Sequence, residues 1–266
     1  MLSDTNARLA AARGLTSSRA RRETGRFLAE GAPAVTEALR RPGVVVQIFA
    51  TAAATHRYAE LLAAAPAGTV SEISERAAAG LSETVHPQGL VAVCRSVDVS
   101  LARALAGGHP RLVVLLVGAN DPGNAGTILR TADAAGADAV LFAGDSVDLY
   151  NGKLVRASAG SLFHLGVVVG LEPVAAIQTC RQAGLRTLAT SGAGRRQLDE
   201  LIDAGELAAP TAWIFGNEAH GLPSELLTVP DETVRVPIYG AAESLNLAAA
   251  AAVCLYSSAR AQRAVR

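Results

Sequence analysis

From Leu112 onward, short apolar runs alternate with segments of helical spacing, and this alternation restricts the fold more than any other feature of the chain. The runs have the length and composition of buried strands: LVVLLVGA, ADAVLFAG, LGVVVG, LRTLATS, TAWIFG and TVRVPIYG. The clearest helices between and after them are NAGTILRTADAAG, PVAAIQTCRQAG and SLNLAAAAAVCLYSSARAQR. Alternation of this kind predicts an α/β domain whose sheet is parallel and flanked by helices.

A smaller α/β unit is predicted between about Leu15 and Asp98. The stretch FLAEGAPAVTEALRR has helical spacing, with Phe27 and Leu28 on its apolar face. Three strands (GVVVQIFAT, GTVSEIS, GLVAVCRSV) and two helices (HRYAELLAAA, ERAAAGLSET) follow in alternation. We therefore expect a second, mainly parallel sheet.

The two units are separated by ALAGGHPR, in which Gly107, Gly108 and Pro110 interrupt any regular structure. The expected division is an N-terminal domain at residues 1–105, a linker at 106–110 and a C-terminal domain at 111–266.

Composition excludes several classes of protein. The chain has 266 residues, of which 50% are hydrophobic and 18% charged, and its formal net charge is zero. Cys94, Cys180 and Cys254 are too far apart to suggest a metal site or a disulfide framework. The first residues lack the apolar core of a secretory signal, and no apolar run approaches the roughly 20 residues that span a bilayer. We therefore expect a compact, cytoplasmic protein with no bound metal and no membrane association.

The first strand-to-helix turn of the larger domain, VGANDPGNAGTILR, has neither G-x-G-x-x-G in the required place nor a Gly-Lys-Ser/Thr phosphate loop. A dinucleotide-dependent oxidoreductase and a nucleoside triphosphatase both lose support. Asn124 is expected to cap the following helix, and Arg130 lies under two turns further along it. The plain alternative is a capped helix with a surface arginine.

Two further turns carry polar groups at strand ends. In WIFGNEAHGLPSELL, Glu218 follows Gly216, while His220 is read as a hydrogen-bonding loop residue in preference to a catalytic base. In VPIYGAAESLN, Ser244 and Asn246 precede an apolar helix, where capping alone would explain them. Ligands of parallel α/β sheets bind beyond the carboxyl ends of the strands, so we expect all three turns to face one crevice.

Together the three turns resemble the motifs of the SpoU (TrmH) branch of the SPOUT superfamily of RNA methyltransferases. The matching stretches are NDPGNAGTILRTADAAGA, IFGNEAHGLP and VPIYGAAESLNLAAAAAVCLY, with KLVRASAGSLFHL between the first two, and the resemblance covers about residues 111–260. RFLAEGAPAVTEAL and VHPQGLVAV are similar to the ribosomal-protein-L30e-like domain that precedes the catalytic domain in several members.

This resemblance implies a sheet with a deep trefoil knot, an S-adenosylmethionine pocket made by the knot and a homodimer with sites near its interface. The implied reaction moves a methyl group to a ribose 2′-hydroxyl. The residues that match the family's catalytic positions are Asn124, Arg130, Glu218, Ser244 and Asn246. Those that match its cofactor-binding positions are Thr190, Gly216, Val236, Ile238 and Leu245.

Arg130 is the central catalytic residue of that set by resemblance. A guanidinium normally stays protonated in proteins, so we expect it to bind an RNA phosphate and to stabilise developing alkoxide charge. Asn124 would orient the same group, and Ser244 and Asn246 would position the hydroxyl. Glu218 is expected either to hold Arg130 or to lie near the sulfonium charge.

RNA engagement is also indicated by an arginine-rich N-terminal stretch, for which a solvated helix face is the alternative reading. Residues 8–26 contain six arginines, and those expected to bind RNA are Arg19, Arg21, Arg22 and Arg26. Aromatic residues make up only 4% of the chain, which favours a folded RNA over a stacked single strand. We expect rRNA as the substrate, with tRNA or a non-catalytic RNA-binding role as alternatives.

Overall fold

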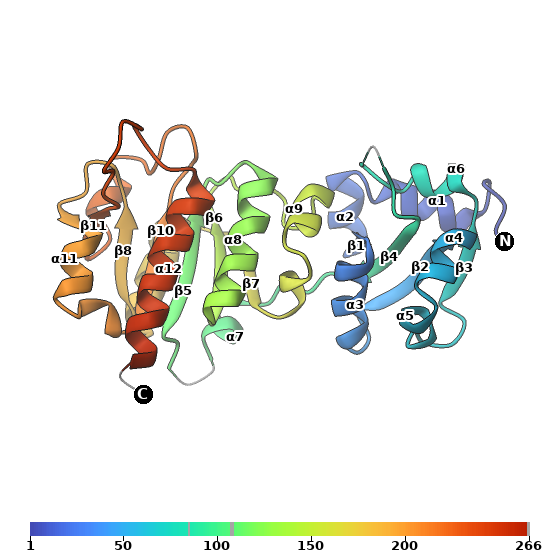
Figure 1. Cartoon of the computed structure of the whole chain (residues 1–266), viewed down its shortest axis with the longest axis horizontal. Coiled ribbons are helices and arrows are strands. Elements are labelled where there is room, and N and C mark those ends of the chain that lie inside the picture. Colours follow the sequence, from blue (N-terminus) through green and yellow to red (C-terminus); the bar gives the residue numbers. More distant parts are fainter. Residues whose placement is uncertain (85, 107–108, 265–266) are drawn as a thin grey trace. The chain divides into compact units, whose positions relative to one another are not determined.

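A computed structural model describes residues 1–84, 86–106 and 109–264, so Gly107 and Gly108 of the expected linker lie outside the described residues (Figure 1). The chain forms two compact units. Unit 1 contains Met1–Val97 and Asp148–His164, and unit 2 contains Asp98–Val147 and Leu165–Arg266.

The sheet of unit 1 has four strands in the order β1-β4-β2-β3. They are β1 (Arg26–Glu30), β2 (Val45–Thr51), β3 (Val70–Ile73) and β4 (Leu90–Arg95). β4 runs antiparallel to both of its neighbours, and only β2 and β3 are parallel. The predicted mainly parallel sheet is therefore wrong for this unit, because alternation along the chain does not reveal strand direction.

Phe27 and Leu28 lie in β1 and not in a helix, which corrects the helical reading of this stretch. Every β1 residue after the first is buried, so no alternation of polar and apolar residues marks the strand. Helix α3 starts only after Gly31, whose φ of 88° breaks the extended chain. The helices of unit 1 are α1 (Ala7–Gly14), α2 (Ser18–Thr24), α3 (Ala32–Arg40), α4 (Ala52–Arg57), α5 (Ala59–Ala63), α6 (Glu75–Ala79), α9 (Gly152–Ala157) and η1 (Ser161–Phe163).

The segment Asp148–His164 belongs to unit 1 by its packing, although its sequence falls in the expected C-terminal domain. The Tyr150 ring stacks on Phe27 with 4.4 Å between ring centroids, and the Tyr150 hydroxyl accepts a hydrogen bond from the Val97 amide at 2.7 Å. Conversely, α7 (Leu101–Leu105) packs against β7 in unit 2. The division by packing thus differs from the division at residues 105 and 111, because contacts far apart in sequence decide it.

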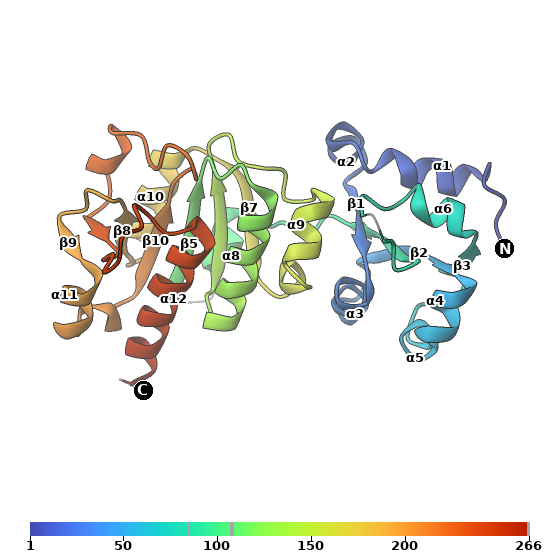
Figure 2. The same cartoon turned by 45° about the horizontal axis from the view of Figure 1, so that its top comes forward.

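The sheet of unit 2 has seven strands in the order β7-β6-β5-β10-β8-β11-β9, and all of its pairings are parallel. This confirms the parallel sheet predicted for the larger domain (Figures 1 and 2). The strands are β5 (Leu112–Val117), β6 (Ala139–Ala143), β7 (Gly166–Leu171), β8 (Arg186–Thr190), β9 (Arg196–Gln197), β10 (Thr211–Phe215) and β11 (Glu232–Arg235). The remaining helices are α8 (Pro122–Ala135), α10 (Pro173–Gln182), α11 (Leu198–Asp203), η2 (Glu206–Ala208), η3 (Leu226–Thr228) and α12 (Leu247–Ala264).

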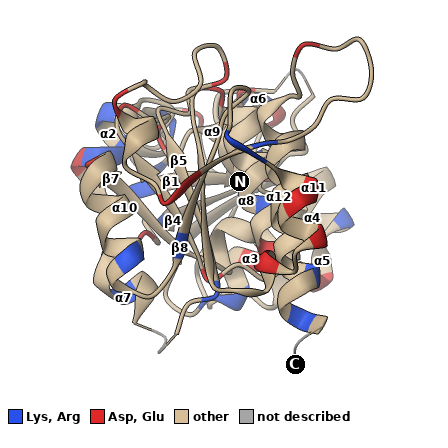
Figure 3. Cartoon of the chain, turned by 90° about the vertical axis from the view of Figure 1, so that its left-hand side faces the viewer, with Lys and Arg blue, Asp and Glu red and all other residues tan. Residues whose placement is uncertain are grey.

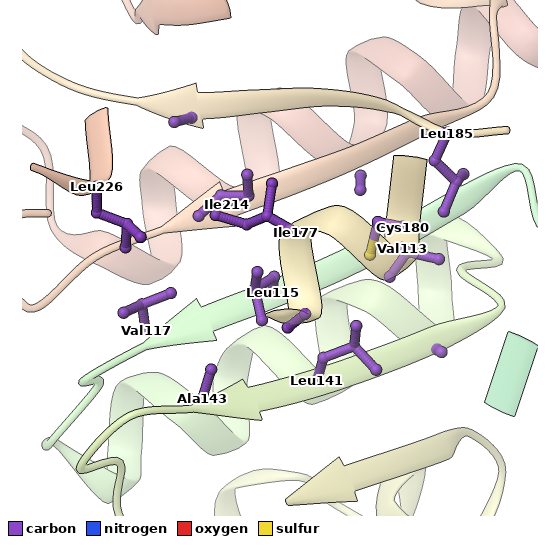
Figure 4. Close-up of a cluster of buried hydrophobic side chains, with 14 of the residues drawn as sticks. Val113, Leu115, Val117, Leu141, Ala143, Ile177, Cys180, Leu185, Ile214 and Leu226 are labelled. Carbon is purple, nitrogen blue, oxygen red and sulfur yellow. The ribbon is translucent and has the colours of Figure 1, made fainter. Parts of the chain in front are cut away.

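Helices cover both faces of this sheet. Ile214 of β10 packs into a buried cluster with Ile177 and Cys180 of α10 (Figure 4). Its neighbour Trp213 points to the opposite face, where its indole N–H donates a buried hydrogen bond of 2.9 Å to Ser258 of α12. α12 also packs along α8, and both helices lie in front of the sheet in Figure 1. Among the described helices, none combines the length and the hydropathy needed to cross a membrane.

Candidate active site

A cavity of about 660 Å³ opens at the carboxyl ends of β8, β10 and β11. This is the position at which parallel α/β sheets bind ligands, and the volume lies within the range of about 300–1,000 Å³ that is usual for ligand pockets. Its lining comes from the ends of β8 and β11, the loops that follow β8, β10 and β11, Gln197 of β9 and the start of α12: Thr190, Ser191, Gly192, Gln197, Asn217, Glu218, Ala219, Gly221, Val234, Arg235, Val236, Pro237, Ile238, Tyr239, Glu243, Ser244, Leu245, Leu247 and Ala250.

The first and second motif turns are joined through the Glu218 carboxylate. It accepts hydrogen bonds from the backbone N–H groups of Asn120 and Asp121, each at 3.2 Å, and from the Asn124 side-chain amide at 3.4 Å. These donors lie at the N-terminus of α8, where the helix dipole favours negative charge. Glu218 therefore holds the start of α8, and the expected pairing with Arg130 is absent from the described part of the chain.

The third turn is joined to the first through Asn246. Its side-chain amide donates to the Asn124 Oδ1 at 3.0 Å, while its own Oδ1 accepts from the Ala248 backbone N–H at 2.9 Å. Asn246 therefore caps α12 and contacts Asn124, a member of the set expected to be catalytic, at the same time. α12 begins at Leu247, three residues later than the sequence suggested, so Ser244 lies in the preceding loop and lines the cavity.

The N-cap of α8 is Asp121 and not Asn124, which corrects the expected capping. The Asp121 carboxylate accepts from the Asn124 backbone N–H at 2.7 Å, and Pro122 occupies the first helical position. Because the Asn124 side chain does not cap the helix, it is available to hydrogen-bond with Glu218 and Asn246. Hydrogen bonds thus link the three turns, in agreement with the expected single crevice.

Arg130 lies exposed on α8, under two turns beyond Asn124. Within the described ranges its guanidinium has no hydrogen bond or ion pair, and it is not part of the cavity wall. Its five N–H donors are available to a ligand that approaches from solvent.

Of the residues expected to bind a cofactor, four line the cavity: Thr190, Val236, Ile238 and Leu245. Gly216 does not, and the structure gives a different reason for it. A Cβ on Gly216 would lie 2.4 Å from the carbonyl carbon of Gly221, so the glycine makes room for the chain's own hairpin.

Sequence reasoning missed Asn217, which fixes that hairpin. Its side-chain amide donates to the Gly118 carbonyl at 2.8 Å, and its Oδ1 accepts from the Ala219 and His220 backbone N–H groups at 2.9 and 3.2 Å. His220 is exposed and makes only this local contact among the described residues, as its reading as a loop residue predicted.

The loop after β8 and Tyr239 were also missed as cavity walls. The Tyr239 hydroxyl hydrogen-bonds to Asp199 on α11, whose acidic residues are red in Figure 3, and this contact raises the pKa of Tyr239. The glycines of SGAG, directly after a predicted strand, were the available signal for this loop.

The N-terminal arginines do not form the uniform surface expected of them. Arg21 is only 5% exposed: it forms an ion pair with Asp148 at 2.7 Å and donates to the carbonyls of Leu15 and Thr16, each at 2.9 Å. Arg21 is thus a packing residue, because α2 turns it inward. Arg19 is paired with Glu23 at 2.7 Å.

Arg22 and Arg26 are exposed. Neither has an acidic partner in the described part of the chain. These two are the members of the expected set that remain available to a ligand.

Comparison with known proteins agrees with this geometry. The model of the SpoU rRNA Methylase family matches residues 111–256, more than half of the chain. The chain belongs to the SpoU rRNA methylase family. An MRM3-like substrate binding domain matches residues 6–92, and so the N-terminal part of this SpoU protein corresponds to a known substrate-binding module.

Relatives of known structure and activity extend over both units. The 23S rRNA (guanosine(2553)-2'-O)-methyltransferase RlmP of Bacillus subtilis is 36% identical over 242 residues, which cover 91% of this chain and 92% of that protein. The SpoU methyltransferase AviRb from Streptomyces viridochromogenes, in complex with the cofactor AdoMet, aligns with a TM-score of 0.83 at 29% identity and covers 98% of this chain and 100% of that chain. An AdoMet-bound rRNA methyltransferase from Sinorhizobium meliloti aligns with a TM-score of 0.81 at 31% identity, covering 98% and 97%.

Proposed function

We propose that this SpoU protein transfers a methyl group from S-adenosylmethionine to a ribose 2′-hydroxyl of 23S rRNA. The observation that carries the proposal is the cavity at the carboxyl ends of β8, β10 and β11, beside which hydrogen bonds join the three motif turns. The relative RlmP, which acts on 23S rRNA, matches across both units, and this supports rRNA over tRNA.

The cavity has the chemistry that the donor requires. Val236, Ile238 and Leu245 offer apolar surface for an adenine ring, and the loop backbones offer N–H and C=O groups for its edges and for the ribose. The carboxylates of Glu218 and Glu243 line the same space and favour a cation. When bound, the donor supplies an electrophilic methyl group on a positively charged sulfur.

The remaining residues act on the acceptor. As the new C–O bond forms and a neutral thioether leaves, the 2′-hydroxyl gives up its proton to solvent, so negative charge develops on its oxygen. We assign two roles to Arg130: it binds an RNA phosphate beside the target ribose, and it stabilises that developing charge. Its guanidinium is exposed and unpaired in the described structure, so it is available for both. Ser244, in the cavity wall, positions the hydroxyl, and Asn246 and Asn124 fix the loop that carries it.

A trefoil knot is also proposed for unit 2. β8 and β9 follow one another in sequence but flank β11 in the sheet, so the connecting residues 191–195 must cross the later strand. The crossing is tight: a Cβ on Gly194 would lie 2.5 Å from the carbonyl carbon of Val234. Chain connections seldom cross in this way. A trefoil knot, in which the C-terminal segment passes through the loop at residues 191–195, would explain the crossing.

A homodimer is proposed from the outer surface of the same unit. Val253 and Tyr256 lie one turn apart on the same side of α12 and are 43% and 53% exposed. An exposed apolar patch of this kind is typical of a subunit interface. Changing Tyr256 to Arg should shift the protein from dimer to monomer in sedimentation, whereas a monomeric wild-type protein would contradict the dimer.

A transfer assay tests the proposed activity. Deproteinised 23S rRNA incubated with the protein and labelled S-adenosylmethionine should acquire label at a ribose that then resists alkaline cleavage, because a 2′-O-methyl group blocks attack on the neighbouring phosphate. Label on a base, or transfer to tRNA alone, would contradict the proposal.

The cysteines are free and buried, which suits action in a reducing cytoplasm.

A further inference from the structure

Two arginines face each other across the β1–β4 pair of unit 1. Arg26 and Arg95 are register partners on these antiparallel strands, so their side chains project from the same face. The Ser96 backbone N–H donates to the Gly25 carbonyl at 2.9 Å, which makes Arg26 and Arg95 a non-hydrogen-bonded pair. In such pairs the Cα atoms are about 4.5 Å apart and the side chains are at their closest.

Both side chains are exposed, and neither has a carboxylate partner anywhere in the described residues. Other arginines of this unit are paired, for example Arg40 with Glu37 at 2.7 Å and Arg156 with Glu30 at 3.0 Å. Like charges directly opposite one another destabilise a sheet. The free protein therefore carries an electrostatic cost at this position, and an anion bound between the two guanidinium groups would remove it.

A third arginine, Arg8 of α1, is bonded to a side chain on the same face of the sheet. Gln47 of β2 is the register partner of Val93, which lies two residues before Arg95 and therefore shares its face. The Gln47 amide nitrogen is held by Ser71 at 3.1 Å, while its Oε1 accepts from Arg8 of α1 at 3.3 Å. Arg26 and Arg95 thus lie side by side on strands roughly 4.8 Å apart, Gln47 lies on the next strand two residues along from Arg95, and Arg8 is bonded to Gln47.

We propose that Arg26, Arg95 and Arg8 form an arginine row that binds the sugar-phosphate backbone of the RNA substrate. The inference rests on the proposed function and adds to it the surface by which unit 1 holds RNA. Guanidinium groups match phosphate oxygens in pairs, and contacts of this kind position an RNA without reading its sequence. The row shares Arg26 with the set that the sequence singled out, and it adds Arg95 and Arg8 in place of the arginines of α2.

The test uses the full chain carrying Arg26→Gln and Arg95→Gln together. Binding of deproteinised 23S rRNA is measured between 50 and 300 mM salt, values on the order of those over which phosphate contacts respond. The logarithmic salt slope should fall by about 1 for each arginine removed. The thermal unfolding midpoint should stay unchanged or rise, since a repulsive pair has been removed. The pair Arg26→Lys and Arg95→Lys should keep the slope.

Arg57→Gln is the matched control, because Arg57 is exposed and unpaired in the described structure but lies on α4. This variant should bind RNA with the same salt slope as the wild-type protein. A double variant with the wild-type slope, or one whose unfolding midpoint falls by several degrees, would overturn the inference. If the wild-type protein itself neither binds nor methylates 23S rRNA, the proposed function fails, and the two failures are thereby distinguished.

Discussion

Arg21 and Arg22 are neighbours in an arginine-rich stretch, and sequence alone gives them the same role. Their environments differ completely, because neighbouring residues of α2 point in different directions. Arg21 is buried against Asp148, and Arg22 is exposed to solvent. The partner Asp148 lies 127 residues away in sequence. Local composition therefore predicted a basic surface but could not predict which arginine serves packing.

Replacing Arg21 with Gln should destabilise the protein. The change leaves Asp148 without its partner and removes two hydrogen bonds to backbone carbonyls, a loss on the order of 3 kcal/mol in the free energy of unfolding. Urea denaturation measures it, with the exposed Arg22→Gln as control. If the Arg21 variant kept wild-type stability but bound RNA more weakly, Arg21 would be an RNA contact. Its burial argues against that role.

Replacing Arg130 with Ala should reduce methyl transfer by a factor of at least about 100, the typical effect of removing one donor to a developing oxyanion. Affinity for S-adenosylmethionine should stay within about twofold by calorimetry, because Arg130 is not in the cavity wall. Parallel loss of donor affinity would place the residue on the donor side and contradict this assignment.

At the scale of elements, strand ends and helix starts were more predictable than strand directions. The parallel order of unit 2 follows from alternating strands and helices, but the antiparallel pairings of β4 do not, since they depend on long-range contacts. The polar residues of the three turns were singled out because ligands of parallel α/β sheets bind beyond the strand ends. The bonds among Asn124, Glu218 and Asn246 could not be predicted, because they depend on how the turns approach one another.

Asp231 ties β8 to β11 and should make stability depend on pH. Partial burial acts to raise its pKa, but hydrogen bonds from the Thr187 N–H and hydroxyl, together with Arg181, outweigh burial and leave the pKa lowered. A lowered pKa means that the stabilisation is present above the unfolded-state value and is lost as pH falls through the folded value.

Asp231→Asn should therefore cost about 1 kcal/mol at pH 6, a typical net value for lost hydrogen bonds. The gap to the wild-type protein should narrow as pH drops below the ordinary value of 3.8. Denaturant titrations at several pH values measure this, with the exposed Asp145→Asn as control. A gap that stays constant with pH would show that the carboxylate charge contributes nothing.

At the scale of the whole molecule, one chain contains two compact units that present different features. Unit 2 contains the cavity and the motif turns, and unit 1 matches a substrate binding domain and presents unpaired arginines. The sequence predicted both units, but it assigned residues 148–164 to the second one, whereas they pack into the first. The unit to which this segment belongs is decided by tertiary contacts, such as the stacking of the Tyr150 ring on the Phe27 ring. No local sequence pattern encodes such contacts.

We propose that loops from three distant parts of unit 2 together form the donor site. A crystal structure of the protein with S-adenosylhomocysteine, the product left by the donor, tests it most directly. We predict the ligand in the cavity of about 660 Å³, with its adenine against Val236, Ile238 and Leu245 and its sulfur towards Ser244. A ligand bound elsewhere while this cavity contains only solvent would contradict the account.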